Sequence, residues 1–389
     1  MNFVFLSPHF PTNYYQFAVA LRDLGANVLG LADEPYENLC HELKSALNEY
    51  YYVPNMHNYD DLLRGMGYFT HHYGKINGLD SLSEYWLETE ARLRTDFNIP
   101  GLRENELPTI KRKSLMKAMF KKAGVPSAPG VVIKTAAQAR KFARETGFPI
   151  IAKPDIGVGA AKTYKFNTME ELDVYLNTLP PVDYYLEKYI IGEIITFDGL
   201  TDQNGDLVFY SSLRYSQGIM ETVNEDRDVY YYTLRTIPAE IEKAGRAIIK
   251  IYGIKARFFH FEFFVTPEGE TLALEVNMRP PGGLTTDMWN FANDFNIYHE
   301  WANILLHNRF SATYSRPYHC CYIGRKSNLE YKHTHRQVIT RCGSLLMTHE
   351  PMAGVFSAAL GDYGYLIRSP ELKELKEIAL YAQAKMGEE

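Results

Sequence analysis

The amino-acid sequence predicts a protein of several subdomains that belong to the α/β and α+β classes. A chain of 389 residues with 46% apolar composition can bury more than one core. The first hundred residues alternate apolar strands with helical patterns, which is typical of a parallel α/β unit. The later part carries long alternating strands joined by turn-rich segments, which is typical of antiparallel sheet.

The first unit, residues 1–105, is predicted to be a parallel α/β domain. We expect strands at residues 3–6 and 28–31, and helices at residues 13–24 and 59–73. The loop at residues 7–12 lies between the first strand and a helix, where parallel sheets commonly bind ligands.

Three further units are predicted after a linker at residues 98–108. Residues 106–190 alternate helices at 114–123, 136–145 and 169–177 with strands that end at Lys153, Phe166 and Glu187, as in a small α+β lid. Residues 191–310 carry long strands, and residues 311–389 form a last, mainly β unit with a terminal helix.

Two strands, residues 257–265 and 271–279, separate polar from apolar side chains. Alternation places one set on an apolar face: Phe259, Phe261, Phe263, Val265, Leu272, Leu274, Val276 and Met278. The opposite face carries His260, Glu262, Glu275, Asn277 and Arg279. A turn centred between residues 268 and 269 would pair Glu262 with Glu275 and His260 with Asn277.

This pairing predicts a metal site. Two carboxylates roughly 5 Å apart destabilise each other unless something neutralises them, and carboxylate and amide oxygens suit Mg²⁺. Glu262, Glu275 and Asn277 are therefore candidate ligands, while we assign His260 to lining the site. The solvent-facing side of an ordinary antiparallel sheet is the alternative, although this face lacks Lys, Thr and Ser.

A nucleotide-binding segment is expected elsewhere, because Mg²⁺ usually takes phosphate oxygens as further ligands. A short apolar strand leads into Lys153, and small residues follow at Gly157, Gly159, Ala160 and Ala161. Backbone N–H groups of such a loop can approach phosphates closely. The spacing is neither that of a dinucleotide fold nor that of a P-loop, and an ordinary hairpin turn is the alternative.

In their order and spacing, these segments resemble the ATP-grasp superfamily over about residues 1–310. That family has a strand lysine before a small-residue loop, a Glu-anchored adenine linker, an acid for the ribose, and a late Glu…Glu-x-Asn metal set. The matching residues are Lys153 with Gly157 to Ala161, then Glu187, Lys188, Tyr189 and Ile190, then Glu193, and finally Glu262, Glu275 and Asn277. An earlier phosphate-directed lysine matches Lys113, for which Lys111, Arg112 and Lys117 are neighbouring substitutes.

The resemblance implies ATP and Mg²⁺, or Mn²⁺, as cofactors, with Lys153 and Arg279 as catalytic residues. Biotin-carboxylase-like members carry a Glu-His pair after the metal set, and the stretch from Arg279 to Asp287 lacks it. The Arg-Pro-x-Gly-Gly form is more similar to amino-acid and peptide ligases. This favours an ADP-forming carboxylate–amine ligase that works through an acyl phosphate. A biotin-carboxylase-like enzyme, a carboxylate kinase and a nucleotide-binding regulatory scaffold are the alternatives.

Two segments depart from a simple assignment. The phosphate loop lacks the Ser or Thr often found in the family, so its contacts would rest on backbone amides and Lys162. Residues 211–228 are polar, and Arg214 could hold an acceptor carboxylate while Glu221 or Glu225 holds an amine. A surface excursion is an equal alternative for this segment.

Composition restricts the partners and the location. The net charge of −6 and the short basic runs argue against nucleic acid. No apolar stretch approaches a membrane span, and the first residues carry no basic leader. We therefore expect a cytoplasmic protein with small-molecule carboxylate and amine substrates, and a homodimer remains open. Its four cysteines are expected to be reduced thiols that bind no metal, with Cys320 and Cys321 on opposite faces of a strand.

Overall fold

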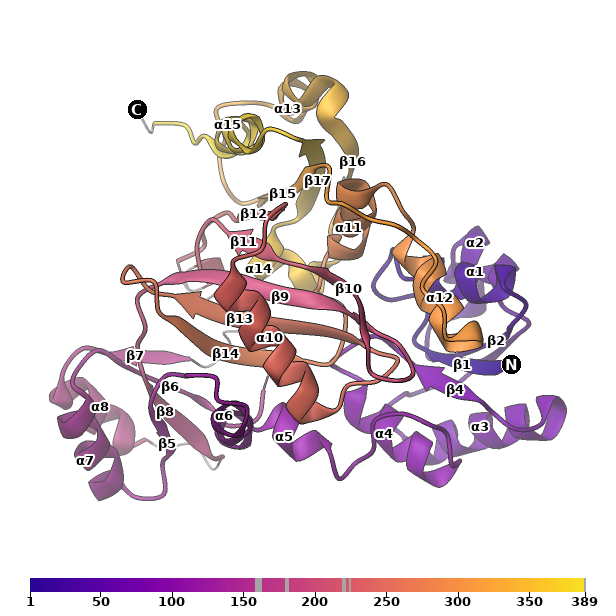
Figure 1. The fold of residues 1–389 in the computed structure, drawn as a ribbon, viewed down its shortest axis with the longest axis horizontal. Helices are drawn as coiled ribbons and strands as arrows, with labels where there is room; N and C mark the ends of the chain where they lie inside the picture. The colour runs from indigo at the N-terminus through magenta and orange to yellow at the C-terminus, as the bar shows by residue number, and fades with distance from the viewer. Residues whose placement is uncertain (158–162, 179–181, 219–221, 224, 388–389) are drawn as a thin grey trace.

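The structure is a computed structural model that describes residues 1–157, 163–178, 182–218, 222–223 and 225–387. The described residues fold around three sheets (Figure 1). The N-terminal sheet lies on the right of that view, a small sheet lies at the lower left, and a large sheet lies between them and continues toward the C-terminal strands. The predicted mixture of α/β and α+β architecture is confirmed. None of the described helices is long and apolar enough to span a bilayer.

The N-terminal sheet is parallel, with strand order β3-β2-β1-β4, as predicted. Its elements are β1 (Asn2–Leu6), α1 (Tyr15–Asp23), β2 (Asn27–Ala32), η1 (Tyr36–Asn38), α2 (His41–Ala46), β3 (Glu49–Tyr52), α3 (Tyr59–Tyr73), β4 (Gly78–Asp80) and α4 (Leu87–Asp96). The central strands are apolar throughout because helices cover both faces of a parallel sheet. Part of that cover comes from the distant helix α12 (Ile297–His307), since Phe17 packs against Tyr298 and Trp301 with ring centroids 4.6 and 5.0 Å apart.

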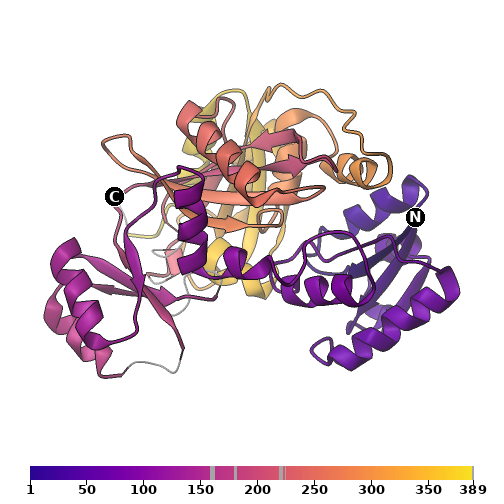
Figure 2. The same cartoon turned by 60° about the horizontal axis from the view of Figure 1, so that its bottom comes forward.

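The small sheet is antiparallel, with strand order β5-β8-β6-β7. Its elements are β5 (Gly130–Val132), α7 (Ala136–Thr146), β6 (Ile150–Pro154), β7 (Tyr164–Phe166), α8 (Met169–Leu176) and β8 (Tyr184–Lys188). Helices α5 (Leu107–Lys111) and α6 (Lys113–Lys122) run between the N-terminal body and this sheet, which Figure 2 shows in purple. They bring the first residue of α6 to the end of β6, where the backbone N–H of Lys113 donates to Asp155 O over 2.8 Å.

The large sheet contains the strands from β9 onward, in the order β14-β13-β9-β11-β12-β15-β17-β16, with β10 also pairing with β9. These strands are β9 (Glu193–Thr201), β10 (Leu207–Ser211), β11 (Leu213–Tyr215), β12 (Tyr230–Thr233), β13 (Phe258–Val265), β14 (Thr271–Asn277), β15 (His319–Arg325), β16 (Leu346–Pro351) and β17 (Tyr363–Ser369). The C-terminal strands therefore extend the same sheet that carries the predicted metal hairpin. The four-domain division of the chain stays a prediction.

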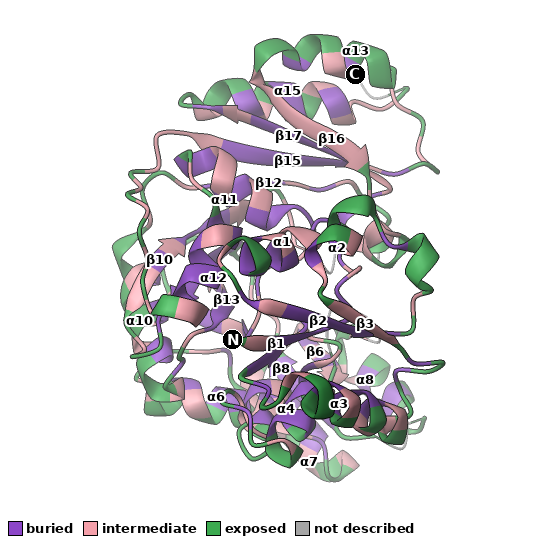
Figure 3. Ribbon diagram, turned by 90° about the vertical axis from the view of Figure 1, so that its right-hand side faces the viewer, coloured by how far each residue is buried: buried purple, intermediate pink, exposed green. Residues whose placement is uncertain are grey.

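Helices cover both faces of the large sheet. They are α10 (Ala239–Tyr252), α11 (Thr285–Asn293), α13 (His335–Cys342), α14 (Ser357–Leu360) and α15 (Leu372–Gln383), with short turns η2 (Gly343–Leu345) and η3 (Gly354–Phe356). Cys320 and Cys321 enter different apolar clusters, so their predicted placement on opposite faces of a strand is confirmed. Figure 3 shows β15 and β17 buried beneath helices whose outer faces are exposed. Helix α10 packs closely against β9 at Gly245. A Cβ at this position would lie 2.1 Å from the Phe197 ring, so only glycine fits there.

The apolar face of the metal hairpin differs from the prediction in one strand. The register shifts between Glu262 and Phe263, so that Phe263 pairs with Ala273 and not with Leu274. Because a bulge adds one residue to a strand, the alternation of β14 reverses there. Ala273 joins Phe263 in the core, and the predicted placement of Leu272 and Leu274 beside the phenylalanines is wrong.

Candidate functional site

Two carboxylates face each other on the hairpin of β13 and β14. The register pairs Glu262 with Glu275 and His260 with Asn277, so both predicted pairings are confirmed. His260 and Asn277 are buried, while the two glutamates are partly buried. The hairpin therefore brings two carboxylates and one amide together on the polar face.

Glu262 is held by a histidine and an aspartate. His260 Nδ1 lies 2.6 Å from Asp198 Oδ1, on the neighbouring strand β9, and its Nε2 lies 3.1 Å from Glu262 Oε1. Burial alone would lower the pKa of His260, but the two carboxylates outweigh burial and raise that pKa to about 9. A protonated His260 can donate to both carboxylates at once, as expected for a residue that lines the site.

The two glutamates differ in charge balance. Burial acts to raise the pKa of Glu262, but the hydrogen bond and charge of His260, with Arg279 and Lys153, bring the pKa below its usual value. Burial raises the pKa of Glu275, although Lys113 acts against the increase. Lys113 Nζ is 4.0 Å from Glu275 Oε1, beyond hydrogen-bonding distance. Glu275 is therefore paired with Lys113 by a long ion pair and not by a hydrogen bond.

This donor set fits a magnesium ion that arrives with phosphate. No three His, Cys, Asp or Glu side chains gather as a metal site within the part of the chain that the structure describes. Glu262, Glu275 and Asn277 would supply oxygen ligands, and Mg²⁺ held by one or two carboxylates usually takes its other ligands from water and phosphates. Their assignment as metal ligands stays a prediction.

Two lysines share the buried carboxylate of Glu187. Lys153 Nζ, from β6, lies 2.9 Å from Glu187 Oε1, and Lys117 Nζ, from α6, lies 2.9 Å from Glu187 Oε2. Burial acts to raise the pKa of Glu187, but the two lysines together hold it below its usual value. Glu187 thus fixes the positions of two cations near the metal hairpin. Lys117 also donates to Ala273 O of β14 over 3.3 Å.

Lys113 reaches the predicted phosphate loop. Its Nζ donates to Gly157 O over 2.7 Å, and burial lowers its pKa. Gly157 has a φ of +149°, in the region that favours glycine. The other predicted loop residues, Gly159, Ala160, Ala161 and Lys162, lie outside the described residues.

The predicted adenine linker joins the small sheet to the large one. Glu187 and Lys188 end β8, Tyr189 and Ile190 follow, and Glu193 begins β9. Glu193 is exposed and forms an ion pair with Arg214 of β11, so the predicted ribose acid and the predicted carboxylate-binding arginine contact each other. Nucleotide contacts of these residues stay predictions.

The rest of the predicted substrate segment is only partly described. Glu221 lies outside the described residues. Glu225 forms an ion pair with Arg227 over 2.5 Å, and both side chains are exposed. The substrate-binding role of residues 211–228 stays a prediction.

Arg279 lies near Glu84, an acid from the N-terminal part of the chain. Its Nη1 donates to Pro280 O over 2.7 Å, and its Nε lies 3.9 Å from Glu84 Oε2. That Glu84 oxygen is buried and has no hydrogen-bond partner among the described residues. Burial raises the pKa of Glu84, although Arg279 acts against the increase. An arginine fork and an unpartnered carboxylate therefore lie together beside the metal hairpin.

Sequence reasoning missed Asp198 and Glu84 as members of this site, and it named Lys117 only as a substitute for Lys113. Lys117 lies one helical turn after Lys113, so an i, i+4 spacing could have selected both lysines. Asp198 follows Ile194, Ile195 and Phe197 in the strand, and a carboxylate among such apolar residues could have indicated a buried partner. Glu84 had no local signal, because its contact with Arg279 joins segments that are far apart in the sequence.

Comparisons with known proteins agree with this geometry. The family described as the ATP-grasp domain matches residues 146–287. The L-arginine-specific L-amino acid ligase of Bacillus subtilis is 24% identical over 245 residues, which are 58% of this chain and 59% of that enzyme. The chain thus spans less than two thirds of the length of this curated relative.

Solved structures agree over nearly the whole fold. The L-amino acid ligase from Bacillus licheniformis superposes with a TM-score of 0.77 at 16% identity, covering 100% of this chain and 99% of that one. N5-carboxyaminoimidazole synthetase from Staphylococcus aureus, complexed with ADP, gives a TM-score of 0.74 at 13% identity and covers 98% and 96%. At these identities the likeness establishes the fold.

Proposed function

Because this chain carries an ATP-grasp domain, we propose that it is an ATP- and Mg²⁺-dependent ligase. It would activate a small carboxylate as an acyl phosphate and join that carboxylate to an amine, with release of ADP and phosphate. One observation carries the proposal: two facing carboxylates, an amide and three buried or nearly buried lysines converge where the small and large sheets meet.

The lysines provide positive charge for the triphosphate. Lys153 and Lys113 would bind phosphate oxygens, with backbone N–H groups of the loop that begins at Gly157. Lys113 now donates to a backbone carbonyl and Lys153 to Glu187, so both ammonium groups are held in the site. The linker from Glu187 to Ile190 would hold the adenine, and Glu193 would bind the ribose after separating from Arg214.

Glu262, Glu275 and Asn277 would hold the magnesium ion. A bound Mg²⁺ neutralises the charge of the transferring phosphoryl group and aligns the reactants. The protonated His260 fixes the orientation of Glu262, and the raised pKa of Glu275 reflects a carboxylate that gains from an added cation. These features support a metal site whose protein ligands would be largely assembled in advance.

Arg279 would orient the acceptor carboxylate or the reacting phosphoryl group, because its planar fork matches either group. The acceptor carboxylate attacks the γ-phosphorus and ADP leaves, and the amine then displaces phosphate from the acyl group. No protein nucleophile is needed. The lid carrying Lys153 must close over the site, because water would hydrolyse an acyl phosphate.

Amino acids are the substrates to test first. Two relatives act on amino acids according to their names, the L-arginine-specific L-amino acid ligase of Bacillus subtilis and the L-amino acid ligase from Bacillus licheniformis. The paired charges of Arg279 and Glu84 also suit a molecule that carries both a carboxylate and an ammonium group.

The test is to incubate the protein with Mg-ATP and pooled amino acids, small carboxylates and amines. ADP release and product masses are followed, with hydroxylamine present in parallel samples. A ligase yields ADP and a new mass equal to acid plus amine minus water. A carboxylate kinase yields a hydroxamate but no amide. Binding of ATP without turnover in any pool would favour the regulatory scaffold and contradict the proposal.

A further inference from the structure

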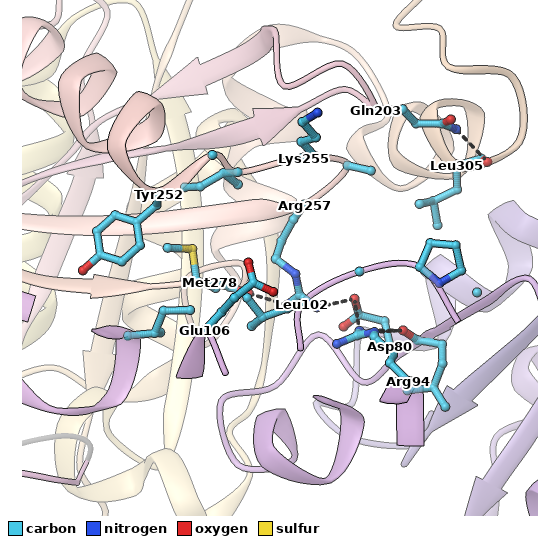
Figure 4. A pocket seen from close by; sticks show the side chains of 18 of the residues that line it. Asp80, Arg94, Leu102, Glu106, Gln203, Tyr252, Lys255, Arg257, Met278 and Leu305 are labelled. Atoms are coloured by element: carbon cyan, nitrogen blue, oxygen red, sulfur yellow. Dashed lines mark hydrogen bonds and ion pairs between the residues drawn. The ribbon is translucent and has the colours of Figure 1, made fainter. Parts of the chain in front are cut away.

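A large cavity lies between the N-terminal sheet and the end of α10, and its lining includes none of the residues assigned to the nucleotide site. Its volume is about 1010 Å³, and it is bounded by the starts of β1 and β4, the linker after α4, the end of α10 and the strand leading into β13. Figure 4 shows Gln203 and Lys255 on one side, Asp80 and Arg94 on the other, and Arg257 between them. The volume is that of a site for a drug-sized molecule.

Two buried arginines form part of the cavity lining. Arg94 is 1% exposed and Arg257 is 9% exposed. Arg257 Nη2 lies 3.0 Å from Asp80 Oδ2, and Arg94 Nη2 lies 3.2 Å from the same oxygen. The Nη1 of Arg94 is buried and has no hydrogen-bond partner among the described residues. Because this nitrogen is closed to solvent, a ligand in the cavity would contact Arg257 and not this atom.

The charged side chains that line the cavity are three cations and two acids. Its two acids are already engaged, because Asp80 accepts from both arginines and Glu106 Oε2 accepts from the backbone N–H of Arg103 over 2.8 Å. Lys255 is exposed and forms no ion pair within the described part of the chain. A ligand with a negatively charged group would complement both Lys255 and the arginine lining.

The remaining lining is apolar. Leu79, Ile110, Ile254 and Met278 are buried side chains on the cavity wall, and Leu102 and Leu305 are partly buried at its edge. Apolar walls with a few convergent polar groups are typical of small-molecule sites. We propose that this cavity is a second binding site, separate from the nucleotide site, for a small organic anion with an apolar body.

Arg257 connects the cavity to the metal hairpin. Its Nη1 donates to Met278 O over 2.7 Å, and Met278 lies between Asn277 and Arg279 in the sequence. A ligand held by Arg257 is therefore in a position to influence the strand that carries both residues.

The test uses 8-anilinonaphthalene-1-sulfonate, which joins one sulfonate to an aromatic body and fluoresces when it binds. We expect saturable binding of one molecule per chain that saturating Mg-ADP does not displace. Lys255→Glu, which reverses the free charge, and Leu102→Trp, which fills the cavity, should each weaken binding roughly tenfold or more. Thermal unfolding verifies that each variant is folded.

Lys250→Glu is the matched control. Lys250 is exposed and lines a neighbouring cavity of about 320 Å³, which it shares with Lys255 but not with Leu102. Its charge reversal should leave the affinity unchanged. Equal weakening by Lys250→Glu, full affinity in both Lys255→Glu and Leu102→Trp, displacement by Mg-ADP, or no saturable binding would each overturn the proposal.

Discussion

Two buried clusters of charged side chains in this molecule are built from different cations. The lysine cluster consists of Lys113, Lys117 and Lys153 with Glu187 and Glu275. The arginine cluster consists of Arg94 and Arg257 with Asp80 and Glu90. In the arginine cluster each carboxylate lies 2.9 to 3.4 Å from nitrogens of both arginines, so that the ion pairs close a ring.

The lysine cluster is less complete. Lys113 remains 4.0 Å from Glu275, and burial lowers the pKa of both Lys113 and Lys117. An arginine fork is pre-organised to hold carboxylates, whereas a lysine ammonium is a compact charge on a flexible stem. The comparison therefore separates a cluster whose ion pairs join the N-terminal segment to the large sheet from one whose lysines are less fully paired. Substitutions in the two clusters should have opposite consequences for activity and stability.

The largest expected effect is the loss of turnover in Glu275→Gln. If Glu275 holds Mg²⁺ as proposed, its loss forfeits several kcal/mol of charge stabilisation, so the proposed Mg-ATP turnover should fall on the order of a thousandfold. The free energy of unfolding should not decrease, because the raised pKa of Glu275 marks a carboxylate that is costly to bury. Glu270→Gln is the control, because Glu270 is exposed and directly precedes the same strand. Full turnover in Glu275→Gln would remove this residue from the metal site.

The opposite result is expected in the arginine cluster. Arg257→Met leaves Asp80 and Glu90 with Arg94 alone, and breaking a buried ion pair costs about 3–5 kcal/mol. Urea unfolding measures the loss, and Arg92→Met serves as the control because Arg92 is exposed on α4. An unchanged unfolding midpoint would mean that the cluster does not join the two domains.

The pH dependence of stability tests His260. Its pKa rises from 6.5 to about 9 on folding, so its contribution is complete below pH 6.5 and is lost as the pH rises through 9. Between these values the wild type should lose about 3 kcal/mol more stability than His260→Gln. Chemical unfolding at several pH values measures this difference. His71→Gln, at an exposed position, should follow the wild type, and parallel curves for His260→Gln and wild type would exclude a protonated His260.

The smallest effect is expected for Arg279→Lys. A lysine retains the charge but not the planar fork, so turnover should fall about 10- to 100-fold. Mg-ADP affinity should stay near that of the wild type, because Arg279 is assigned to the acceptor and the reacting phosphoryl group. Turnover and nucleotide binding are measured on the same preparation. A loss confined to nucleotide affinity would move Arg279 into the nucleotide site.

Local patterns were sufficient for much of the fold. The helix at residues 59–73 and the parallel N-terminal unit followed from periodicity and apolar runs. The pairing of Glu262 with Glu275 followed from the period of two and the turn position. The bulge beside Glu262 could not be predicted, because an inserted residue is stabilised by the packing of Ala273 against the phenylalanine core and not by a turn residue.

The sequence by itself determined which side chains could bind phosphate and magnesium, because residue type, order and spacing are local properties of the chain. Only the tertiary structure decided which of them meet. Lys117 and Lys153 both pair with Glu187, and His260 pairs with Asp198. Glu84 lies near Arg279, although the two residues are far apart in the sequence. The residues in these contacts are 34 to 195 positions apart in the sequence. The packing of sheets and helices therefore decides whether they meet. The cavity lined by Arg257 and Lys255 was also decided by the tertiary structure, since no single segment of the sequence encloses it.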